Sequence, residues 1–366
     1  MKRIIINGAN GYVASNFIND LLLQNFEVVA LVRGNETKPA EMRMKKAMVD
    51  INEGSFVKPD NLKIFNYSLL DDNFGIPEET LEELFDGEVD YYHFAASLKY
   101  DFKAKDEIFQ TNMDGVQNSV RVFSKFAGKE SRFFFISTAY SCGKFDGLFE
   151  EKFYDIADIS EFRNYYEQSK RYAENLIRKH MDEEGLKGHI LRLSQVVGNS
   201  RTGVTVTDYG IFDFARRIQS LAARNPNRTV RVKVDPESTQ NLIPIDTVVT
   251  YLMQTVKVQN LPVIMNMVAK QAVSNRFILK ALCDLLPINL VPQVDLDKSE
   301  MDSYERIISI GMSFTSSYTG TNLLFDTRKL DEALTEEVSE MSEDAALRML
   351  EYFLGKSSDK KAKVAC

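Results

Sequence analysis

Short apolar runs alternate with amphipathic segments along the first half of the chain. The runs at 4–6 and 133–136 are continuous, which is typical of strands buried on both faces of a sheet. Between such runs, apolar residues recur at helical spacing. Alternating strands and helices predict a parallel sheet with helices on both faces. We expect strands at 3–7, 27–32, 62–66, 90–94, 132–137 and 188–193, and helices at 12–24, 78–85, 106–127 and 164–184.

This alternation is interrupted twice. The stretch between Gly34 and Asn61 is too long for an ordinary loop, and its centre at 40–49, rich in Met, Lys and Ala, predicts an inserted helix. After Gly198 the alternation ends, which predicts that the chain enters a second lobe. We expect this lobe at 199–240 and 269–354, returns to the sheet at 240–254 and 263–268, and a lysine-rich, disordered tail at 355–366.

Composition and charge exclude several classes of protein. With 366 residues, 44% of them hydrophobic and 27% charged, the chain has the composition of an ordinary soluble protein. Its net charge of −8 argues against binding of nucleic acid or of an anionic membrane. No apolar run approaches the ~20 residues that span a bilayer. The first strand also begins too early for a signal peptide, so we expect a cytoplasmic protein without a membrane span.

The cysteines and histidines argue against a metal site. The three cysteines show no metal-ligand spacing, and an odd number suits no disulfide framework. The three histidines lie in unrelated contexts, which argues against a zinc site, so we expect no metal. These residues are Cys142, Cys283, Cys366, His93, His180 and His189.

A glycine-rich turn follows the first predicted strand. Gly8 and Gly11 stand between that strand and the first predicted helix, and Ala14 takes the third glycine position of a dinucleotide-binding turn. Bare backbone at such a turn lets a pyrophosphate approach the N-terminus of the helix. A tight turn without a ligand is the alternative, but the position at the first strand–helix junction favours a dinucleotide cofactor.

The end of the second predicted strand indicates which nicotinamide cofactor binds. NAD sites carry an acid there for the ribose 2′-hydroxyl, whereas an Arg suits the 2′-phosphate of NADP. Here the strand ends in Arg33, and no acid follows until Glu36. A guanidinium can hold a phosphate by a forked pair of hydrogen bonds, so we expect NADP(H). Arg33 as a plain surface residue is the alternative. Further positive charge follows at Lys38, Arg43, Lys45 and Lys46.

A second motif is a Tyr and a Lys four residues apart, which share one face of a helix. Tyr166 and Lys170 begin a long predicted helix and follow Ser137 and Thr138 at the end of a predicted strand. Two other pairs have this spacing but lack this context, because a glycine interrupts the first and no strand end with hydroxyl groups precedes the second. These pairs are Tyr140 with Lys144 and Tyr352 with Lys356.

These residue types suit hydride transfer to a carbonyl group. A nearby ammonium lowers the pKa of a phenol, so we expect Lys170 to lower the pKa of Tyr166 and to hold the nicotinamide ribose. Tyr166 would protonate the oxygen that forms as the hydride arrives. Thr138 would hydrogen-bond the carbonyl and stabilise the developing oxyanion, with Ser137 as the alternative donor.

Together these motifs resemble those of the extended short-chain dehydrogenases/reductases over most of residues 1–270. Gly8, Gly11 and Ala14 resemble the cofactor turn of that superfamily, residues 93–96 its segment after the fourth strand, and Asn112 its structural asparagine. The resemblance implies an α/β fold with a Rossmann-like, doubly wound parallel sheet and a smaller C-terminal substrate-binding lobe. Residues 1–198 and 241–268 would form the NADP-binding domain. The expected cofactor contacts are Gly8, Asn10, Gly11, Tyr12, Val13, Arg33, Ser68, Leu69, Ala95, Ala96, Ser97, Asn112, Ser137, Tyr166, Lys170, Ser194 and Val196.

Within that superfamily the chain is most similar to the thioester-reductase and fatty acyl-CoA reductase branch, whose NAD-binding domain is of the male-sterility type. Two positions depart from the pattern of this branch. Leu193 replaces a usual proline, and Ser68 stands where an adenine-contacting Asp is typical. The similar segments are 137–140, 166–174, 192–203 and 241–246.

The motifs and the resemblance predict an NADPH-dependent oxidoreductase that reduces an acyl thioester or an aldehyde, with Thr138, Tyr166 and Lys170 as catalytic residues. Its partner would be a small carbonyl substrate, free or bound to coenzyme A or a carrier protein, and a homodimer stays open. One alternative is a nucleotide-sugar epimerase or dehydratase of the same superfamily, against which the missing second-strand acid argues. Another is a non-catalytic NADP-binding regulatory protein, which would need no proton donor.

A basic run without acids extends over 214–234. In an acidic protein such a run can receive the phosphates of coenzyme A or phosphopantetheine, or an acidic carrier protein. A solvated basic face is the other interpretation. The basic residues are Arg216, Arg217, Arg224, Arg228, Arg231 and Lys233.

Overall fold

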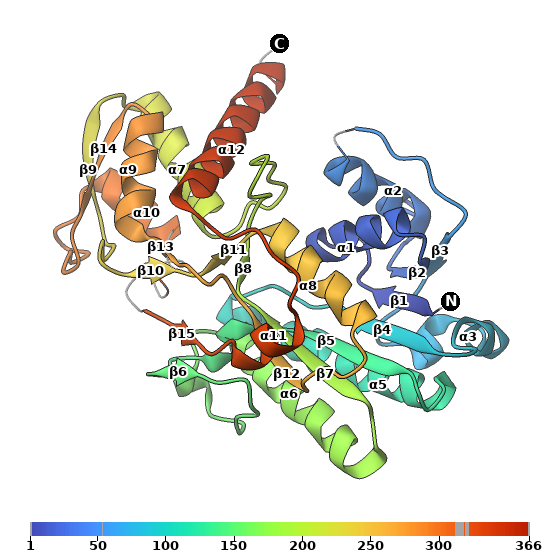
Figure 1. Ribbon diagram of the computed structural model, residues 1–366. Coiled ribbons are helices and arrows are strands. Elements are labelled where there is room, and N and C mark those ends of the chain that lie inside the picture. Colours follow the sequence, from blue (N-terminus) through green and yellow to red (C-terminus); the bar gives the residue numbers. More distant parts are fainter. Residues whose placement is uncertain (1, 53, 312–317, 319–321, 365–366) are drawn as a thin grey trace. The chain divides into compact units, whose positions relative to one another are not determined.

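The computed structural model describes residues 2–52, 54–311, 318 and 322–364 (Figure 1). The chain divides into two compact units, and the first is assembled from three separate stretches. Residues 195–198 and 241–247 belong to the second unit and 325–337 to the first. The first unit contains Met1–Ser194, Val248–Met267 and Phe325–Glu337, and the second Gln195–Thr247, Val268–Leu324 and Val338–Cys366.

The first unit is built around a seven-stranded sheet with the order β12-β7-β5-β4-β1-β2-β3. Every neighbouring pair in it is parallel, as predicted. The strand order reverses at β1, which lies between β2 and β4, and α/β sheets bind ligands at the carboxyl ends of the strands at such a point. The strands are β1 (Arg3–Asn7), β2 (Glu27–Val32), β3 (Leu62–Asn66), β4 (Val89–His93), β5 (Arg132–Thr138), β7 (Gly188–Leu193) and β12 (Ile264–Met267).

The strands form where apolar runs predicted them because both faces of the sheet are covered. Every residue of β5 is buried, and residues 4–6 of β1 have no exposed surface. The register pairs Asn7 with His93 and Thr138 with Leu193. Because His93 pairs with Phe135, β5 and β7 extend three residues beyond β1 and β4, and the segments that follow these strands lie at the same, carboxyl edge of the sheet.

Helices lie on both faces of this sheet (Figure 1). On one face, Phe17 of α1 packs edge-on against Tyr92 of β4, with ring centroids 5.0 Å apart. On the other face, Tyr91 and Phe133 form an apolar core with residues of α3, α5 and α6. The helices are α1 (Tyr12–Leu23), α2 (Ala40–Ile51), α3 (Glu78–Leu84), α4 (Lys105–Phe109), α5 (Gly115–Phe126), α6 (Tyr165–Glu184), α8 (Ile245–Lys257) and α11 (Arg328–Ala333).

Three predicted elements differ from the structure. The helix expected at 106–127 is α4 and α5, joined by a π-helical turn at Gln110–Asp114. The segment 240–254 mostly forms α8 instead of returning to the sheet, because its apolar residues recur at helical spacing. The tail at 355–364, expected to be disordered, continues a C-terminal helix, because its Lys, Ala and Asp residues tolerate helical backbone once the preceding turns are packed.

The second unit combines short strand pairs with helices. Its strands pair as β9 with β14 and β8 with β11, both parallel, and β10 with β13, antiparallel. The C-terminal helix α12 packs on α7, where the rings of Phe212 and Phe353 are 5.2 Å apart. The elements are β8 (Gln195–Val196), α7 (Ile211–Arg224), β9 (Arg228–Val232), β10 (Thr239–Gln240), β11 (Leu242–Ile243), β13 (Val273–Ser274), α9 (Asn275–Leu285), β14 (Ile288–Pro292), α10 (Ser303–Gly311) and α12 (Glu343–Val364). Two further short strands are β6 (Leu148–Phe149) and β15 (Leu324–Phe325).

The described residues offer no candidate for a membrane span or for a metal site. No helix in this part of the chain has both the length and the apolar character needed to cross a membrane. No group of three or more His, Cys, Asp or Glu side chains there is arranged to hold a metal ion.

Candidate active site

The glycine turn lies at the carboxyl end of β1, where the strand order reverses. Gly8 has a φ of +60°, and a Cβ at this position would lie 2.8 Å from the backbone N of Ala95, so only glycine fits. The N–H of Gly11 donates to the carbonyl of Gly8 at 2.9 Å, and α1 begins at the next residue. Among the described residues no side chain caps α1, and its first turn carries no acid. This N-terminus can therefore receive an anionic group.

Asn7, which the sequence analysis did not single out, holds the segment that faces this turn. Its side-chain oxygen accepts hydrogen bonds from the backbone N–H groups of Phe94 at 2.8 Å and Ala95 at 3.0 Å. Its amide nitrogen donates to Nδ1 of His93 at 2.9 Å. A polar residue that ends a fully buried run of isoleucines was the available signal, because a buried polar side chain requires partners.

His93 is a neutral structural histidine. Because Nδ1 accepts from Asn7, the ring proton lies on Nε2, which donates to the carbonyl of Ala95 at 2.9 Å. Burial lowers the pKa of His93 to about 3, and the positive charge of Lys170 acts in the same direction. Together Asn7 and His93 fix the backbone of Ala95 against Gly8. Ala96 and Ser97 continue this segment and are partly buried.

Arg33 follows the carboxyl end of β2 directly and is exposed. Its positive charge acts to lower the pKa of the nearby Tyr67. The hydroxyl of Tyr67 accepts a hydrogen bond from the N–H of Gly8 at 3.2 Å. Burial raises the pKa of Tyr67 to about 12. No carboxylate is paired with Arg33 among the residues described. The guanidinium is thus close to the glycine turn and available to an anion there.

The inserted helix predicted at 40–49 is present as α2. Met44 and Met48 bury its apolar side, while Lys45 is exposed and Lys46 pairs with Asp50 at 2.5 Å. A Cβ on Gly34 would lie 2.4 Å from the backbone N of Ala40, so the loop after Arg33 folds back onto the start of α2. This return brings Lys38 and α2 near the end of β2.

The predicted catalytic residues come together at the end of β5. Thr138 is the last residue of that strand and donates its Oγ1 hydrogen to the carbonyl of Leu193 at 3.2 Å. Tyr166 lies in the first turn of α6, and its hydroxyl is hydrogen-bonded to the side chain of Thr138. Asn164 caps α6 by accepting the N–H of Glu167 at 3.0 Å, which fixes where this helix begins.

Lys170 lies one turn further along α6 and is almost fully buried. Its Nζ donates to the carbonyl of Ile136 at 2.8 Å and lies 4.6 Å from the ring centroid of Phe135. Burial lowers the pKa of Lys170 to about 7, against the opposing charge of Glu174.

The pKa of Tyr166 differs from the prediction that Lys170 would lower it. Burial raises the pKa of Tyr166 above its ordinary value, the hydrogen bond with Thr138 opposes this, and the charge of Glu167 adds to it. Desolvation governs because both the phenol and the ammonium are withdrawn from water. At neutral pH Tyr166 therefore carries its proton, as a proton donor must.

Asn112 connects the segment after β4 to α6. Its side-chain oxygen accepts from the N–H of Ser97 at 2.7 Å, and its amide nitrogen donates to the carbonyl of Ser97 at 3.2 Å. The same nitrogen donates to Oγ of Ser169 at 2.9 Å. The π-helical turn carries Asn112, and such turns frequently occur at functional sites.

The remaining predicted site residues belong to both units, and all but one of them to the first. Ser68 and Leu69 follow β3 and are partly buried. Ser194 follows β7, and its buried Oγ has no hydrogen-bond partner among the described residues. Val196 lies in β8 of the second unit. Ser137 donates its Oγ hydrogen to Glu174 at 2.6 Å. Asn10, Tyr12 and Val13 belong to the turn and first residues around α1.

The other Tyr–Lys pairs stand in different surroundings. Tyr140 belongs to a 3-10 turn, and Nζ of Lys144 donates to the carbonyl of Ser160 at 2.8 Å. Tyr352 lies on α12 in the second unit, where Nζ of the exposed Lys356 lies 3.3 Å from its hydroxyl. Tyr140 follows the hydroxyl-bearing end of β5 but shares no regular helix with Lys144, and no strand end with a hydroxyl side chain precedes Tyr352.

The basic run at 214–234 is largely neutralised inside the second unit. Arg216 and Arg217 pair with Asp213 at 2.6 and 2.8 Å. Arg228 pairs with Asp302 at 2.7 Å, and Arg231 with Glu305 at 2.8 Å. The sequence pattern missed these acids because they lie outside the run. These partners weaken the interpretation of the run as a phosphate-binding surface.

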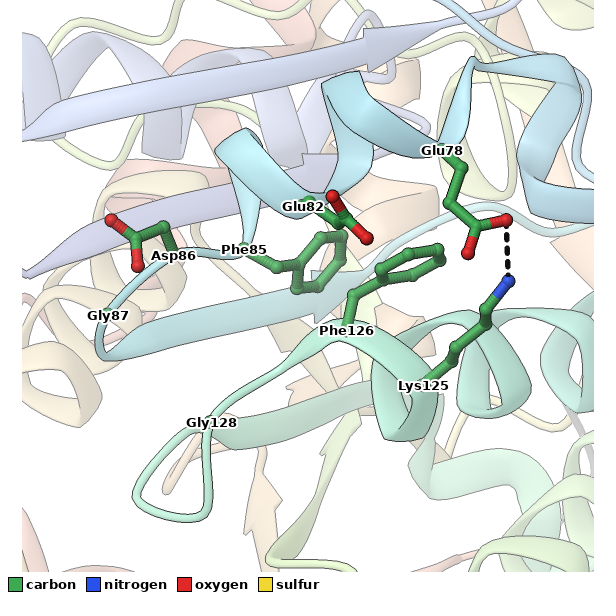
Figure 2. A pocket seen from close by; sticks show the side chains of 8 residues that line it. All are labelled: Glu78, Glu82, Phe85, Asp86, Gly87, Lys125, Phe126 and Gly128. Carbon is green, nitrogen blue, oxygen red and sulfur yellow. Dashed lines mark ion pairs between the residues drawn. The ribbon is translucent and has the colours of Figure 1, made fainter.

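A separate cavity of about 340 Å³ lies at the opposite, amino-terminal edge of the sheet (Figure 2). Gly87 and Gly128 precede β4 and β5 there, and Phe126 lines the wall. Lys125 at its rim pairs with Glu78 at 3.0 Å. The cavity is therefore distinct from the site formed by Thr138, Tyr166 and Lys170.

The fold and the geometry define an NAD(P)-binding α/β domain of the extended short-chain dehydrogenase/reductase type. The family model described as male sterility protein, an NAD-binding family, matches residues 6–252, and the chain belongs to this family. The chain is 26% identical over 274 residues to L-2-aminoadipate reductase of Saccharomyces cerevisiae. That match covers 69% of this chain and 18% of the yeast protein, so the chain spans less than a fifth of this relative.

Solved structures share the fold at lower identity. The terminal R domain of the myxalamid PKS-NRPS pathway superposes with a TM-score of 0.79 at 17% identity, over 98% of this chain and 91% of that one. A thiolation-reductase di-domain of an archaeal non-ribosomal peptide synthetase gives 0.73 at 16% identity, over 98% and 76%. UDP-glucuronic acid 4-epimerase of Bacillus cereus with NAD gives 0.66 at 17% identity, over 97% and 99%. The chain thus shares its fold with reductase domains and with an epimerase.

Proposed function

We propose that this chain is an NADPH-dependent reductase that transfers a hydride to the carbonyl carbon of an acyl thioester or an aldehyde. One observation carries the proposal. The hydroxyls of Thr138 and Tyr166 are hydrogen-bonded at the carboxyl end of β5, with Lys170 one turn along the same helix. The glycine turn after β1 opens at the same edge of the sheet.

In this reaction bound NADPH supplies the hydride, and the side chains handle the oxygen. Thr138 holds the carbonyl oxygen beside Tyr166 once its hydroxyl hydrogen turns from the carbonyl of Leu193 to the substrate. Tyr166 gives its proton to that oxygen as negative charge develops there. The buried ammonium of Lys170 stabilises the phenolate that remains. A thioester reduced in this way yields a hemithioacetal that releases a thiol and an aldehyde, and an aldehyde yields an alcohol.

We assign NADPH as the cofactor on the basis of Arg33. Its exposed guanidinium follows the end of β2, where NAD-binding sheets carry an acid. The loop that folds back onto α2 carries Lys38, and no acid lies between Arg33 and Glu36. A ribose 2′-phosphate would find positive charge there and no repelling carboxylate.

The acyl group is proposed to be bound as a thioester to coenzyme A or to a carrier protein. The support comes from the fold relatives, one of which joins a reductase to a thiolation domain. Because most arginines of the run at 214–234 are ion-paired, we do not assign the phosphates of such a substrate to that run.

The decisive experiment follows NADPH oxidation with acyl-coenzyme A, acyl-pantetheine and aldehyde substrates and identifies the product. Tyr166→Phe removes the proton donor and keeps the ring, so turnover is expected to fall by about 10²–10⁴-fold while NADPH still binds. Tyr352→Phe is the matched control, since this Tyr is also followed by a Lys, and turnover should stay within a few-fold. Near-full activity of Tyr166→Phe on a verified substrate would contradict the assignment.

The same assay separates the alternatives. A nucleotide-sugar epimerase interconverts its substrates without net consumption of NADPH, and the fold relatives include such an enzyme. A regulatory protein binds the cofactor and oxidises none with any substrate. Stoichiometric oxidation of NADPH with formation of an aldehyde or alcohol supports the reductase and argues against both.

A further inference from the structure

Glu174 continues the stripe of catalytic residues along α6. It follows Tyr166 and Lys170 at the next helical repeat and has no exposed surface. Its Oε1 accepts hydrogen bonds from Oγ of Ser137 at 2.6 Å and from Oγ of Ser141 at 3.1 Å. These two serines flank Thr138 on both sides along the chain. A carboxylate of α6 thus holds the strand end that carries the predicted carbonyl-binding hydroxyl.

Arg192 holds Glu174 from the other side. Its Nη2 lies 2.7 Å from Oε2 of Glu174 and its Nε 3.0 Å from Oε1, and both side chains are fully buried. Arg192 also donates to the carbonyls of Glu150 at 3.1 Å and Lys152 at 3.0 Å, and its guanidinium lies 4.5 Å from the ring centroid of Phe149. Burying this pair is costly unless its geometry is fixed and its remaining hydrogen bonds are made. The network therefore resists any shift of α6 along β5.

The alternation of side chains along β5 assigns different roles to its two hydroxyls. Phe135 and Ser137 lie two residues apart on one face, and both contact α6, through Lys170 and Glu174. Thr138 is the last residue of β5, and its hydroxyl is hydrogen-bonded to Tyr166 in the first turn of α6. Ser137, considered above as an alternative donor to the substrate, is occupied by Glu174.

We propose that Glu174 is a positioning residue of this site, which fixes Thr138 against Tyr166 through Ser137 and supplies the buried negative charge that faces Lys170. The inference rests on the proposed reductase function. The other charged or titratable groups that face these two residues are Arg171 on α6, Arg192 on β7 and His93 on β4. Glu174, by its negative charge, favours the charged form of Lys170.

The positional part is tested by Ser137→Ala, which deletes one hydroxyl and leaves the buried ion pair intact. A small displacement of a catalytic group can cost about 10²-fold in rate. We therefore expect kcat to fall by about 10- to 100-fold, with KM and the Kd for NADPH within about 2-fold. Ser131→Ala is the matched control, because Ser131 is also buried but precedes the amino end of β5, where its Oγ accepts from the N–H of Val89 at 3.0 Å. Equal kcat values for both variants would overturn this part of the proposal.

The electrostatic part is tested by Glu174→Gln with a readout that needs no turnover. In a protein carrying ¹³C-labelled lysine, the Nζ-linked carbon of Lys170, assigned by its loss in Lys170→Met, reports the titration by NMR. We expect the Lys170 titration to move to lower pH in Glu174→Gln and to stay unchanged in Ser137→Ala. An unchanged Lys170 titration in Glu174→Gln would overturn the electrostatic part of the proposal.

Failure of this inference is distinguishable from failure of the proposed function. If no carbonyl substrate is reduced by the unmodified protein, the proposed function fails while the NMR titration still tests Glu174. If Glu174→Gln does not fold because it leaves Arg192 unpaired, the titration of Lys170 is measured in Glu174→Asp instead. Because this variant keeps the negative charge, its Lys170 titration must stay close to that of the unmodified protein. A large shift in that variant would contradict the proposal.

Discussion

Single side chains set the charge balance of the candidate site. Arg33 supplies an exposed positive charge at the end of β2, whereas Lys170 is a buried cation whose pKa is lowered to about 7. His93 at the end of β4 is neutral because burial lowers its pKa to about 3. These three residues respond differently to substitution and to pH, so each can be tested by itself.

Removal of the Arg33 guanidinium should change the preference between the two nicotinamide cofactors. The unmodified protein is expected to bind NADPH more tightly than NADH, and Arg33→Ala should narrow that gap by about 1–3 kcal/mol, the range for loss of a charged hydrogen bond. Titration calorimetry or cofactor fluorescence measures both affinities. Equal affinities for NADPH and NADH in the unmodified protein would contradict the assignment.

Lys170 should make stability rise with pH above neutrality. Its pKa is about 7 in the folded chain and about 10.5 when exposed, so between these values the unfolded state binds more protons than the folded state. The free energy of unfolding should therefore increase from pH 7 to pH 9.5. Lys170→Met should lose this part of the increase in urea unfolding experiments. Identical pH slopes for the two proteins would show that Lys170 titrates normally.

The segments after the strands, more than the strands, shape the site. The π-helical turn at Gln110–Asp114 places Asn112 where it bonds both to Ser97 and to Ser169 of α6. Asn7 acts in the same way from the end of β1. Two buried amides thus connect the elements around the predicted nicotinamide position.

Asn112→Ala should weaken both the fold and the activity. It leaves the N–H of Ser97 without its acceptor, so we expect the free energy of unfolding to fall by about 1–3 kcal/mol. Turnover should fall as well, since α6 loses its link to the segment after β4. Asn61→Ala is the control, because that side chain donates to the carbonyl of Phe26 at 2.9 Å, at the start of β2. A variant at Asn112 with unchanged turnover would leave the residue no role beyond stability.

The first unit depends on parts of the chain that are far apart in the sequence. The strand β12 pairs with β7, and its residues Ile264, Met265 and Met267 are buried. Glu151 accepts hydrogen bonds from the N–H groups of Asn266 at 2.9 Å and Lys329 at 2.6 Å. The sheet of the first unit is therefore complete only when β12 and the segment 325–337 are present.

Truncation should reveal this dependence. A chain that ends at residue 263 lacks β12 and 325–337, exposes the edge of β7, and is expected to lose its cooperative thermal transition. A chain that ends at Lys356 keeps Leu354, the last described residue with a buried side chain, and its Tm should stay within a few degrees. Calorimetry of the two proteins checks both expectations. A cooperative transition in the shorter chain would show that the first unit folds cooperatively without β12 and 325–337.

The sequence by itself determined the parallel sheet and the order of its motifs. Continuous apolar runs such as 133–136 have few alternatives to a buried strand, and a glycine turn at the first strand–helix junction is local in the chain. Thr138, Tyr166 and Lys170 were predicted because helical spacing and a strand end are also local patterns. The family match confirms the class of protein that these patterns indicated.

Tertiary structure decided what depends on contacts between distant residues. Asn7 and Glu174 gain their roles from partners such as Ala95 and Arg192, which no spacing along the chain relates to them. The arginines at 214–234 looked unpaired in sequence, yet Asp302 and Glu305 neutralise two of them in space. The pKa values of Tyr166 and Lys170 followed desolvation more than their mutual spacing, because burial is a property of the folded chain.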